Sequence, residues 1–433
     1  MTEHDSILAP PLDPGLAQAR VLDAADPLRL MRDEFCFPPG KSGAPKIYLT
    51  GNSLGLQPKG TRQAVLDELD DWARLGVDGH FHARRPWLRY HARFTDVGAR
   101  LVGAQPGEVV VMNALTVNLH LLMVSFYRPT ATRHRIVIER GAFPSDRYLA
   151  HSQARFHGYD PAEAVVELGP REGQHLLDTD DVLHFIETQG HTIAVFLLSG
   201  LNYYTGQVFD IRRITQAARA RGIVVGWDLA HAAGNVELNL HDDDVDFAAW
   251  CTYKYLNAGP GAVGMAFVHE RHHKTADLPR FAGWWGNDPD RRFLMTHEFE
   301  PAPSADGWQL STAPVLLMAP LAASLALFDR VGMRALRQKS EKLTTFLLGL
   351  LDDVTVAHPG KLTVLTPREP SARGNQLSLR VQVEPERFLK ALAEREVVCD
   401  FRRPDVIRAA PTPLYNSFED VWTFAEIVRQ SLA

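Results

Sequence analysis

The amino-acid sequence predicts an α/β protein with a mostly parallel, doubly wound central sheet and a smaller α/β domain at its C-terminal end. Three observations lead to this fold class. Apolar runs with the length of strands alternate with helical patterns, which is typical of βαβ units. Several of these runs end in a polar residue. From about Ala313 the pattern becomes strongly helical and then mixed, which indicates a second, smaller unit.

The elements before the central sheet are short. The first 45 residues are rich in proline and predict an extended arm with short helices. Hydrophobic periodicity then predicts two helices separated by a polar loop, and after them a strand, a turn and an apolar helix. The expected segments are a short strand at 46–50, helices at 61–74 and 89–102, the loop at 76–87, and the strand, turn and helix over 109–126.

The rest of the chain continues the alternation and then departs from it. Apolar runs predict further strands at 135–139, 192–199, 222–228, 247–252 and 265–269. Beyond them we expect helices at 316–327 and 333–351 interrupted by Pro314 and Pro320, strands at 361–365 and 376–383, and helices at 386–394 and 418–432. The expected divisions are an N-terminal arm that belongs with the small domain (1–60), a large domain (61–312), and connecting helices with the small domain (313–433).

The composition excludes several classes of partner. The 433 residues include 46 basic and 52 acidic side chains, a net charge of −6, so we expect neither a nucleic acid nor an anionic membrane surface as partner. Residues 1–14 are acidic and lack the pattern of a signal peptide. No apolar run is long enough to span a bilayer, so we expect a cytoplasmic protein.

Cysteine and histidine spacing gives no sign of a metal centre. Cys36, Cys251 and Cys399 are far apart in the sequence and are expected to be reduced core thiols. Two close histidine pairs lack neighbouring cysteine or paired carboxylate ligands, so no metal is expected; the pairs are His80 with His82 and His272 with His273.

Lys254 is the candidate for covalent catalysis. Residues 247–252 are apolar, aromatic or β-branched, as in a buried strand, and turn residues follow at 257–261. The chain has nine lysines, and none lies between Gly60 and Tyr253. Desolvation lowers a lysine pKa and frees the amine for Schiff-base formation. The alternative is an ordinary lysine whose stem lies along the strand end while its ammonium reaches solvent.

Asp228 ends another apolar run, 222–228, and His231 follows three residues later. In open α/β sheets the ligand lies outside the carboxyl ends of the parallel strands, so Asp228 and Lys254 are expected to converge on one ligand. Pyridoxal phosphate requires such a pair, because a lysine holds its aldehyde and an acid contacts its pyridinium nitrogen. The pair therefore indicates a pyridoxal phosphate site.

The turn near Thr116 predicts the phosphate end of that site. Strand, turn and helix place the Leu115 and Thr116 amides and the Thr116 hydroxyl at a helix N-terminus, which favours an anion. The alternative is that Thr116 caps the helix, and both uses are compatible. Asp146 and Ser199 are further polar residues at expected strand ends.

Two glycine motifs suggest other functions. Residues 51–55 match G-x-S-x-G, so a serine hydrolase built on Ser53 is an alternative. A nucleophile elbow passes directly from strand to helix, however, whereas the helical pattern here begins only at about Thr61. Residues 259–264 match G-x-G-x-x-G but precede a strand, so we reject a dinucleotide site.

Arg408 lies among apolar residues near the C-terminal end of the chain. A buried guanidinium without a partner is strongly unfavourable. Its fork of donors suits either a substrate carboxylate or a carboxylate of the protein, and both alternatives stay open.

The sequence also resembles the kynureninases, which belong to the aspartate-aminotransferase fold class, fold type I, of pyridoxal phosphate enzymes. The resemblance covers nearly the whole chain, and its most specific block joins the Asp228 and Lys254 segments. The matching segments are Tyr48–Gly55, Phe143–Asp146, Tyr203–Gln207, Asp228–Leu238, Tyr253–Gly259 and Arg408–Ser417. The resemblance implies hydrolysis of L-kynurenine or 3-hydroxy-L-kynurenine to an anthranilate and L-alanine. It implies a role in tryptophan catabolism or NAD biosynthesis through the kynurenine pathway, and a homodimer with composite active sites.

The resemblance also assigns roles to individual residues. Lys254 would form the Schiff base, Asp228 would contact the ring nitrogen, and Phe143 would stack on the ring. The other cofactor residues implied are Leu115, Thr116, Pro144, Ser145, Asp146, Ser199, His231 and Tyr253, with Trp284 and Thr312 reaching the cofactor from the partner subunit. Arg408 would bind the substrate carboxylate, and Ser53, His80 and Ser311 would line the substrate pocket, which makes 51–55 a substrate loop.

The implied chemistry needs two proton-transfer residues. Lys254 would remove the α-proton while Asp228 keeps the pyridine ring protonated. Water adds to the γ-carbonyl, the β,γ bond breaks, and Tyr253 is the expected proton donor. Animal members of the family that prefer the 3-hydroxylated substrate share the histidine at His80 but have asparagine at the position of Thr312, where this chain follows the bacterial pattern. We expect a preference for 3-hydroxykynurenine because His80 offers its phenol a hydrogen bond.

Two alternatives remain at this point. A cysteine desulfurase or an aminotransferase of the same fold would keep Lys254 and Asp228, although a desulfurase also needs a cysteine on a mobile loop. A hydrolase based on Ser53 would be indifferent to Lys254.

Overall fold

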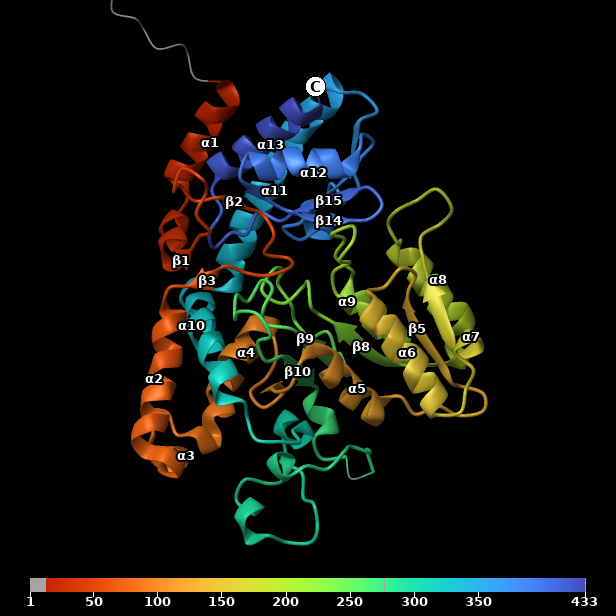
Figure 1. The fold of residues 1–433 in the computed structure, drawn as a ribbon. Coiled ribbons are helices and arrows are strands. Elements are labelled where there is room, and N and C mark those ends of the chain that lie inside the picture. The colour runs from red at the N-terminus through yellow and green to blue at the C-terminus, as the bar shows by residue number, and fades with distance from the viewer. Residues whose placement is uncertain (1–12, 276, 433) are drawn as a thin grey trace, which may run out of the picture.

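The computed structural model describes residues 13–275 and 277–432, which form a large domain and a smaller domain stacked on it (Figure 1). Most of the acidic segment 1–14, on which the expectation about a signal peptide rests, lies outside the described residues. The fold class predicted from the sequence is confirmed, because a large, mostly parallel sheet is flanked by helices and joined to a small α/β domain.

The large domain is built on a seven-stranded sheet whose strands, except one, run in the same direction. Neighbours from β8 to β9, β8 to β7, β7 to β5 and β5 to β6 are parallel, whereas β10 is antiparallel to both β4 and β9. In spatial order the strands are β4 (Val109–Val111), β10 (Met265–Val268), β9 (Phe247–Trp250), β8 (Val224–Asp228), β7 (Ile193–Ser199), β5 (Arg135–Glu139) and β6 (Val165–Leu168).

Both faces of this sheet are covered by helices, which explains why its strands have continuous apolar sequences. Side chains of a strand alternate between the two faces. Val195 and Leu197 of β7 pack in the core that contains α5 (Leu115–Phe126) and α6 (Pro144–Phe156). Phe196 and Leu198 pack in the core on the other face, which contains α8 (Thr179–Gln189) and α9 (Ile211–Ala220).

The parallel register brings the polar strand ends together. Ser199 at the end of β7 is paired with Asp228 at the end of β8, and Asp228 is next to Ala249 of β9. Lys254 follows β9 by four residues, so it leaves the sheet at the same edge. The edge formed by the carboxyl ends of the strands therefore carries the predicted catalytic pair.

The small domain contains a four-stranded antiparallel sheet and receives the N-terminal arm. Its strands, in spatial order, are β11 (Leu362–Val364), β12 (Leu377–Val381), β15 (Val406–Ala409) and β14 (Asp400–Arg402). In the arm, β2 (Ile47–Tyr48) pairs with β13 (Val397–Val398), and α1 (Pro14–Ala25) packs on α13 (Phe418–Leu432). The arm also contains the antiparallel pair β1 (Phe35–Cys36) and β3 (Gln57–Pro58).

The remaining helices connect these units. They are α2 (Gly60–Leu75), α3 (Gly79–His82), α4 (Thr95–Val102), α7 (Pro161–Ala164), α10 (Val315–Val331), α11 (Met333–Ala357) and α12 (Pro385–Glu394). Short 3₁₀ segments lie at Arg29–Glu34, Gly76–Asp78, Trp87–Phe94, Gly190–Thr192, Glu270–His272, Trp284–Gly286, Arg292–Leu294, Ala305–Trp308 and Pro370–Ala372.

Several local expectations were wrong. The helix expected over 89–102 is a 3₁₀ segment with non-helical dihedrals at Arg89, followed by α4. The loop expected over 76–87 contains two short helical turns, one of which includes His80. The helix α10 continues through Pro320, because its buried face, with Met318 and Leu321, packs on α2 and compensates for the missing hydrogen bond.

Two further expectations need correction. Cys36 is exposed on β1, so only Cys251 is a fully buried thiol, and all three cysteines are free. The edge strand β6 was not expected, because its half-buried sequence Val-Val-Glu-Leu is too short to be distinguished from a loop.

Among the described residues, no single helix is both long and apolar enough to cross a membrane; α10 and α11 meet that criterion only as a pair bent by 82°.

Candidate active site

A cavity of about 210 Å³ lies at the carboxyl ends of the large sheet. It brings together residues from five separate loops, which follow β4, β5, β7, β8 and β9. Ten of the residues expected at a cofactor line it, namely Leu115, Thr116, Phe143, Ser145, Asp146, Ser199, Asp228, His231, Tyr253 and Lys254. One cavity thus gathers residues that are separated by as many as 140 positions in the sequence, from Ala114 to Lys254.

Lys254 projects into this cavity from a tightly held loop. Its Nζ lies 3.0 Å from His231 Nε2 and 5.9 Å from the centre of the Phe143 ring. The loop is held by Thr252, whose hydroxyl donates to the Val263 carbonyl. Burial, and next the neighbouring Lys254 ammonium, hold the pKa of His231 well below its ordinary value, so His231 is a neutral acceptor for the lysine.

The glycine motif at 51–55 packs against this lysine loop. The amide of Gly55 donates to the Tyr253 carbonyl at 2.8 Å. A side chain at Gly55 would collide with the Lys254 carbonyl oxygen and with Asn257, so glycine is required for the close approach. Ser53 itself is exposed in a turn. The short strand β3 (Gln57–Pro58) comes next, and the following helix α2 begins only at Gly60. The motif therefore does not have the geometry of a nucleophile elbow.

Three buried carboxyl groups surround the single lysine. Burial raises the pKa of Asp228 above its ordinary value, while Lys254 lowers it. Burial and then the charge of Asp228 raise the pKa of Asp146 well above the ordinary range. Burial also raises the pKa of Glu139, whose carboxylate accepts hydrogen bonds from the Ser199 amide and from Asn202 at 2.7 Å. This end of the cavity favours a cationic ligand group.

Two helix N-termini at the cavity favour an anion. Helices α5 and α6 both begin here, at Leu115 and Pro144, and neither has a side-chain cap. The N-cap of α5 is Ala114, so the alternative that Thr116 caps this helix is wrong. Instead, the Thr116 and Ser145 hydroxyls lie 3.2 Å apart. Two helix N-termini and two hydroxyls form a site for a phosphate group.

The residues fit pyridoxal phosphate at both ends. Asp146 Oδ1 and His231 Nδ1 are buried without a hydrogen-bond partner, which indicates that a ligand supplies partners for them. The carboxyl-rich end suits a protonated pyridine nitrogen, and the helix N-termini suit the phosphate. Phe143 is half-exposed and lies edge-on to Tyr203 at 5.4 Å between ring centres, which leaves one ring face free.

Arg408 is fully buried and already paired with a protein carboxylate. Asp400 lies opposite it in the register of β14 and β15. Arg408 Nε donates to Asp400 Oδ1 at 2.6 Å, Nη2 also donates to Asp400, and Nη1 donates to the Tyr203 carbonyl at 2.7 Å. A guanidinium has five N–H groups, so two remain, one on Nη1 and one on Nη2. The protein carboxylate therefore leaves room for a second acceptor.

The remaining predicted residues do not line the cavity. His80 and Thr312 line a separate apolar groove of about 340 Å³ between α2 and the start of α10. We call this the apolar groove; its walls are formed by Glu68, Trp72, His80, Trp87 and 312–317. Trp284 is 47% exposed. The other predicted residues outside the cavity are Ser53, Pro144, Ser311 and Arg408.

Sequence reasoning missed three residues that this geometry singles out. Glu139 ends β5 and was overlooked, although it stands at a strand end like Ser199 and Asp228. Tyr203 lines the cavity and was known only as part of a matching segment. Asp400 gave no signal in the sequence, because its importance comes from its pairing across two strands with Arg408.

The fold and this site together define a pyridoxal phosphate enzyme of fold type I. Solved structures of this class resemble the chain. The cystine lyase C-DES, in a mutant with glycine linked to its pyridoxal phosphate, has a TM-score of 0.74 at 18% identity, covering 92% of this chain and 98% of that one. The cysteine desulfurase CsdA from Escherichia coli has a TM-score of 0.72 at 18% identity, covering 94% and 98%. Identities this low show the fold alone.

The sequence comparisons identify the family. The Kynureninase C-terminal domain matches residues 336–428. Kynureninase from Myxococcus xanthus is 59% identical over 94% of this chain and 95% of its own length, and kynureninase from Koribacter versatilis is 53% identical over the same shares. The chain belongs to the kynureninase family, whose members are pyridoxal phosphate-dependent hydrolases of a carbon–carbon bond.

Proposed function

We propose that this chain hydrolyses L-kynurenine or 3-hydroxy-L-kynurenine to anthranilate or 3-hydroxyanthranilate and L-alanine. The observation that carries the proposal is the cavity in which Lys254, His231 and Asp228 meet beside the anion site at the start of α5. The kynureninases that match nearly the whole chain at 50–59% identity support it. Neither a desulfurase nor a Ser53 hydrolase is favoured, since none of the three cysteines lines the cavity and Ser53 lies in an exposed turn outside it.

Cofactor binding is assigned to the residues that line the cavity. Asp228 would contact the pyridine nitrogen, the α5 and α6 N-termini with Thr116 and Ser145 would hold the phosphate, and Lys254 would hold the aldehyde carbon. Bound in this way, pyridoxal phosphate supplies an electron sink for carbanion chemistry at the substrate α-carbon. Trp284 and Thr312 would act from a partner subunit.

Proton transfer is assigned to Lys254 and Tyr253. Lys254 Nζ takes the α-proton, and the neutral His231 beside it accepts a hydrogen bond without adding a second positive charge. Burial and the neighbouring Cys251 raise the pKa of Tyr253, so its phenol keeps its proton at neutral pH and is able to donate it to the product carbon. Water supplies the hydroxyl that ends on the anthranilate carboxyl group.

Substrate binding is assigned to the junction of the two domains. The two free N–H groups of Arg408 would bind the α-carboxylate of the substrate, and Asp400 with the Tyr203 carbonyl would hold the guanidinium in place. We infer that 61–312 is the large, cofactor-binding domain, that 1–60 is an arm belonging with the small domain, and that 313–433 forms the connecting helices and the small domain. The β2–β13 pairing and the packing of α1 on α13 support that division.

We further propose a homodimer with composite active sites. The apolar groove beside α2 contains exposed Trp72, Leu316 and Leu317, and His80 and Thr312 lie in its walls. A second copy that covers the groove would bring His80, with Ser53 and Ser311, to a substrate pocket and Thr312 to the cofactor. His80 would then offer a hydrogen bond to the phenol of 3-hydroxykynurenine. A cytoplasmic location is supported by the exposed free thiol of Cys36.

The proposal is tested by the absorbance spectrum of the purified protein beside that of Lys254→Ala, followed by addition of each substrate. We expect a yellow wild-type protein that releases fluorescent anthranilate, and a variant that has lost the visible band and the activity. A yellow protein that leaves both substrates unchanged would contradict the proposed substrates and keep the cofactor. Comparison of kcat/KM for the two substrates tests the preference, and a higher value for kynurenine would overturn it.

A further inference from the structure

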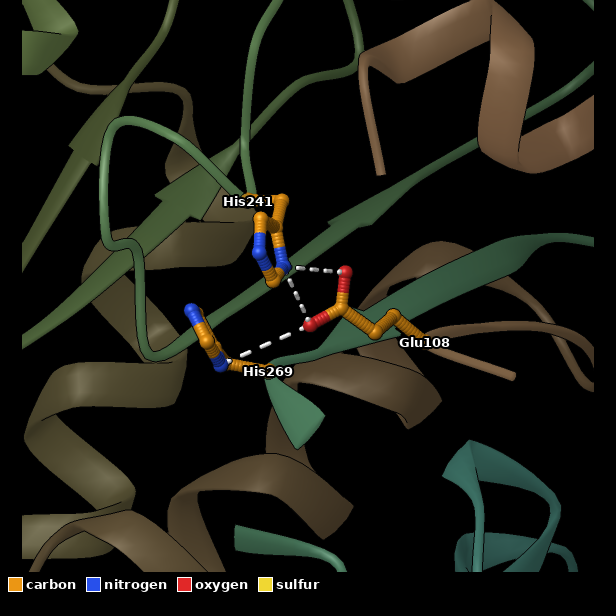
Figure 2. A group of neighbouring side chains, drawn as sticks. All are labelled: Glu108, His241 and His269. Carbon is orange, nitrogen blue, oxygen red and sulfur yellow. Dashed lines mark hydrogen bonds and ion pairs between the residues drawn. The ribbon is translucent and has the colours of Figure 1, made fainter. Parts of the chain in front are cut away.

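A second group of convergent side chains lies at the edge of the large sheet opposite the cofactor cavity. Glu108 directly precedes β4, and His269 directly follows the antiparallel strand β10. His241 comes from the loop between β8 and β9. Their ligand atoms lie within 4.8 Å of one another, and Figure 2 shows both imidazole rings turned toward the same carboxylate. The group is therefore separate from the site already described, because the full length of these strands lies between them.

The carboxylate of Glu108 is fully buried and only partly satisfied by the backbone. Its Oε1 accepts the Glu270 amide at 2.8 Å, and its Oε2 accepts the Gln105 amide at 2.7 Å. A carboxylate offers about four acceptor positions, so one position on each oxygen remains for the histidines. His241 Nδ1 lies 3.0 and 3.1 Å from the two oxygens, and His269 Nδ1 lies 3.4 Å from Oε1.

His269 already presents an unprotonated nitrogen to this carboxylate. Its Nδ1 accepts the amide of Arg271 at 3.3 Å, so this nitrogen carries a lone pair and no proton, and a metal ion would take the place of that long hydrogen bond. Its other nitrogen, Nε2, lies 3.6 Å from Asp244 Oδ1. Histidines that bind metals commonly direct their second nitrogen to a carboxylate, which fixes the tautomer. The arrangement of Asp244, His269 and Glu108 follows this pattern.

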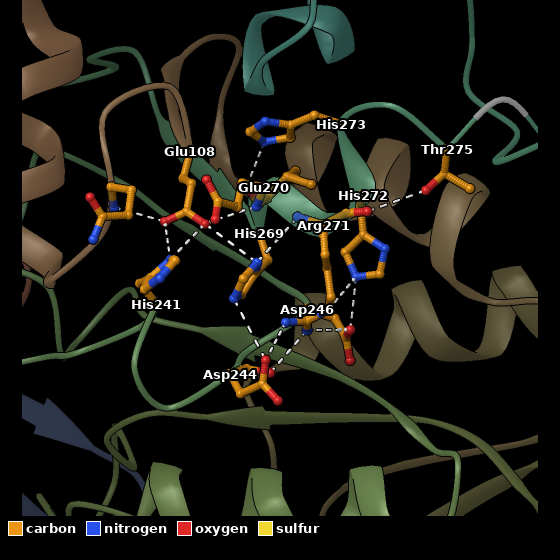
Figure 3. A network of polar contacts seen from close by, with 12 residues as sticks. Glu108, His241, Asp244, Asp246, His269, Glu270, Arg271, His272, His273 and Thr275 are labelled. Carbon is orange, nitrogen blue, oxygen red and sulfur yellow. Dashed lines mark hydrogen bonds and ion pairs between the residues drawn. The ribbon is translucent and has the colours of Figure 1, made fainter.

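The neighbouring acids contact other side chains as well (Figure 3). Arg271 donates to Asp244 at 2.5 Å and to Asp246 at 2.6 Å. His272 lies 2.9 Å from the same oxygen of Asp246. Glu108 is thus the carboxylate that faces the two stacked imidazoles, whose ring centres are 4.8 Å apart.

Two of the three donor separations suit a tetrahedral metal ion, and all the donor atoms lie within 4.8 Å of one another. Bonds of about 2.0–2.1 Å to nitrogen and oxygen place neighbouring ligand atoms about 3.3 Å apart. The separations of Glu108 from His241 and from His269, 3.0 and 3.4 Å, are close to this value. His241 is half-buried, so solvent has access and is able to supply a fourth ligand.

We propose that Glu108, His241 and His269 bind one divalent transition-metal ion of the Zn²⁺ class. Two imidazoles and one carboxylate are the donor set that Zn²⁺, Co²⁺ and Ni²⁺ favour over Mg²⁺ and Ca²⁺. The ion joins the start of β4, the end of β10 and the loop that contains His241, at the edge of the sheet opposite the cofactor cavity. It takes no part in the reaction of the cofactor.

The test uses the holoenzyme, treated with a chelator, dialysed and titrated with Co²⁺. We expect one Co²⁺ per chain, the intense visible bands of four-coordinate cobalt, and a higher unfolding temperature, with no change in the absorbance of the cofactor. His241→Ala and His269→Ala are expected to weaken binding by on the order of tenfold or more, and Asp244→Asn by about tenfold. The matched control is His184→Ala, an exposed histidine on α8, which should bind as the wild type does.

Three results would overturn the proposal. One is the absence of stoichiometric Co²⁺ in the wild-type protein, and another is wild-type affinity in His241→Ala. The third is binding that shifts the cofactor band and disappears with the cofactor, which would place the ion at the cofactor. Because His241 is half-buried on a loop, its variant decides the question even where a change at buried Glu108 or His269 prevents folding.

Discussion

The cofactor cavity and the apolar groove beside α2 differ in how much of each is supplied by one chain. The cavity is lined by residues at five strand ends, and the backbone pairing of the sheet fixes their positions. The groove is lined by helix and loop residues, and its apolar side chains Trp72 and Leu317 are 58% and 46% exposed. Backbone pairing along a sheet edge positions all the residues of a site within one chain, whereas an exposed apolar surface marks a place where another molecule binds.

This difference separates two halves of the proposed active site. Most of the residues proposed for the cofactor lie together in the cavity of one chain, while His80 and Thr312 lie in the groove. Loss of the partner subunit is therefore expected to remove substrate contacts and the two cofactor contacts assigned to Trp284 and Thr312, and to leave the contacts made by the cavity.

The largest effect is expected from Asp228→Asn in the cofactor half. An amide in place of this buried carboxylate would no longer keep the pyridine nitrogen protonated, so kcat should fall on the order of 10³-fold. The measurement is steady-state anthranilate release at saturating cofactor. The control is Asp243→Asn, a mostly buried carboxylate that pairs with Arg212 outside the cavity. Activity within tenfold of the wild type in Asp228→Asn would contradict this role.

Tyr253→Phe separates chemistry from binding within the same half. Loss of the phenol proton should slow turnover on the order of 10²-fold while cofactor affinity changes far less. Titration of the apoenzyme with pyridoxal phosphate gives the affinity, and kcat gives the turnover. An equal loss of both would leave Tyr253 a phosphate ligand and assign the proton to another group.

Leu317→Glu tests the groove. A charge introduced into an apolar interface is left unpaired, so association of two chains should weaken on the order of 10²-fold or more, and activity should fall with it. Sedimentation and kcat/KM are measured over a range of enzyme concentrations. Val356→Glu, an exposed position on α11, is the control. A fully active monomer would show that one chain supplies the whole site.

Asp400→Asn tests how Arg408 is held. The amide would remove the charge that holds the guanidinium, so KM should rise by about tenfold while the cofactor spectrum and kcat change little. Asp405→Asn, at an acid that pairs with Arg380 in the same sheet, is the control. A fall in kcat with unchanged KM would instead place Asp400 in the chemical step.

The smallest effect is expected in the stability of the apoenzyme. The pKa of Asp146 is raised well above the ordinary value near 4, so above that pH the folded chain holds a proton that the unfolded chain has lost. Stability should therefore fall by up to about 1.4 kcal/mol per pH unit as pH rises above 4, until the folded-state pKa is passed. Urea unfolding between pH 5 and 8 should show a smaller fall in Asp146→Asn. If the stability of the wild type and of Asp146→Asn fell equally with pH, the proton would reside on a group other than Asp146.

The sequence predicted the parts of the molecule that depend on local pattern. Apolar runs that end at Ser199 and Asp228 predicted the strands and the edge at which a ligand is expected, and the pair of Lys254 and Asp228 predicted pyridoxal phosphate. The pattern failed where packing overrides propensity. Pro320 lies inside a helix because the buried face of α10 holds it there.

Thus the sequence by itself determined the fold class and the meeting of Lys254 with Asp228 in one cavity, because strand periodicity and the parallel topology oblige these residues to meet. Tertiary structure alone decided which carboxylate pairs with Arg408 and how Glu108, His241 and His269 converge. It also showed that α5 begins without a side-chain cap. These contacts join residues up to 161 positions apart, from Glu108 to His269. Their geometry depends on strand register and domain packing, which no local pattern records.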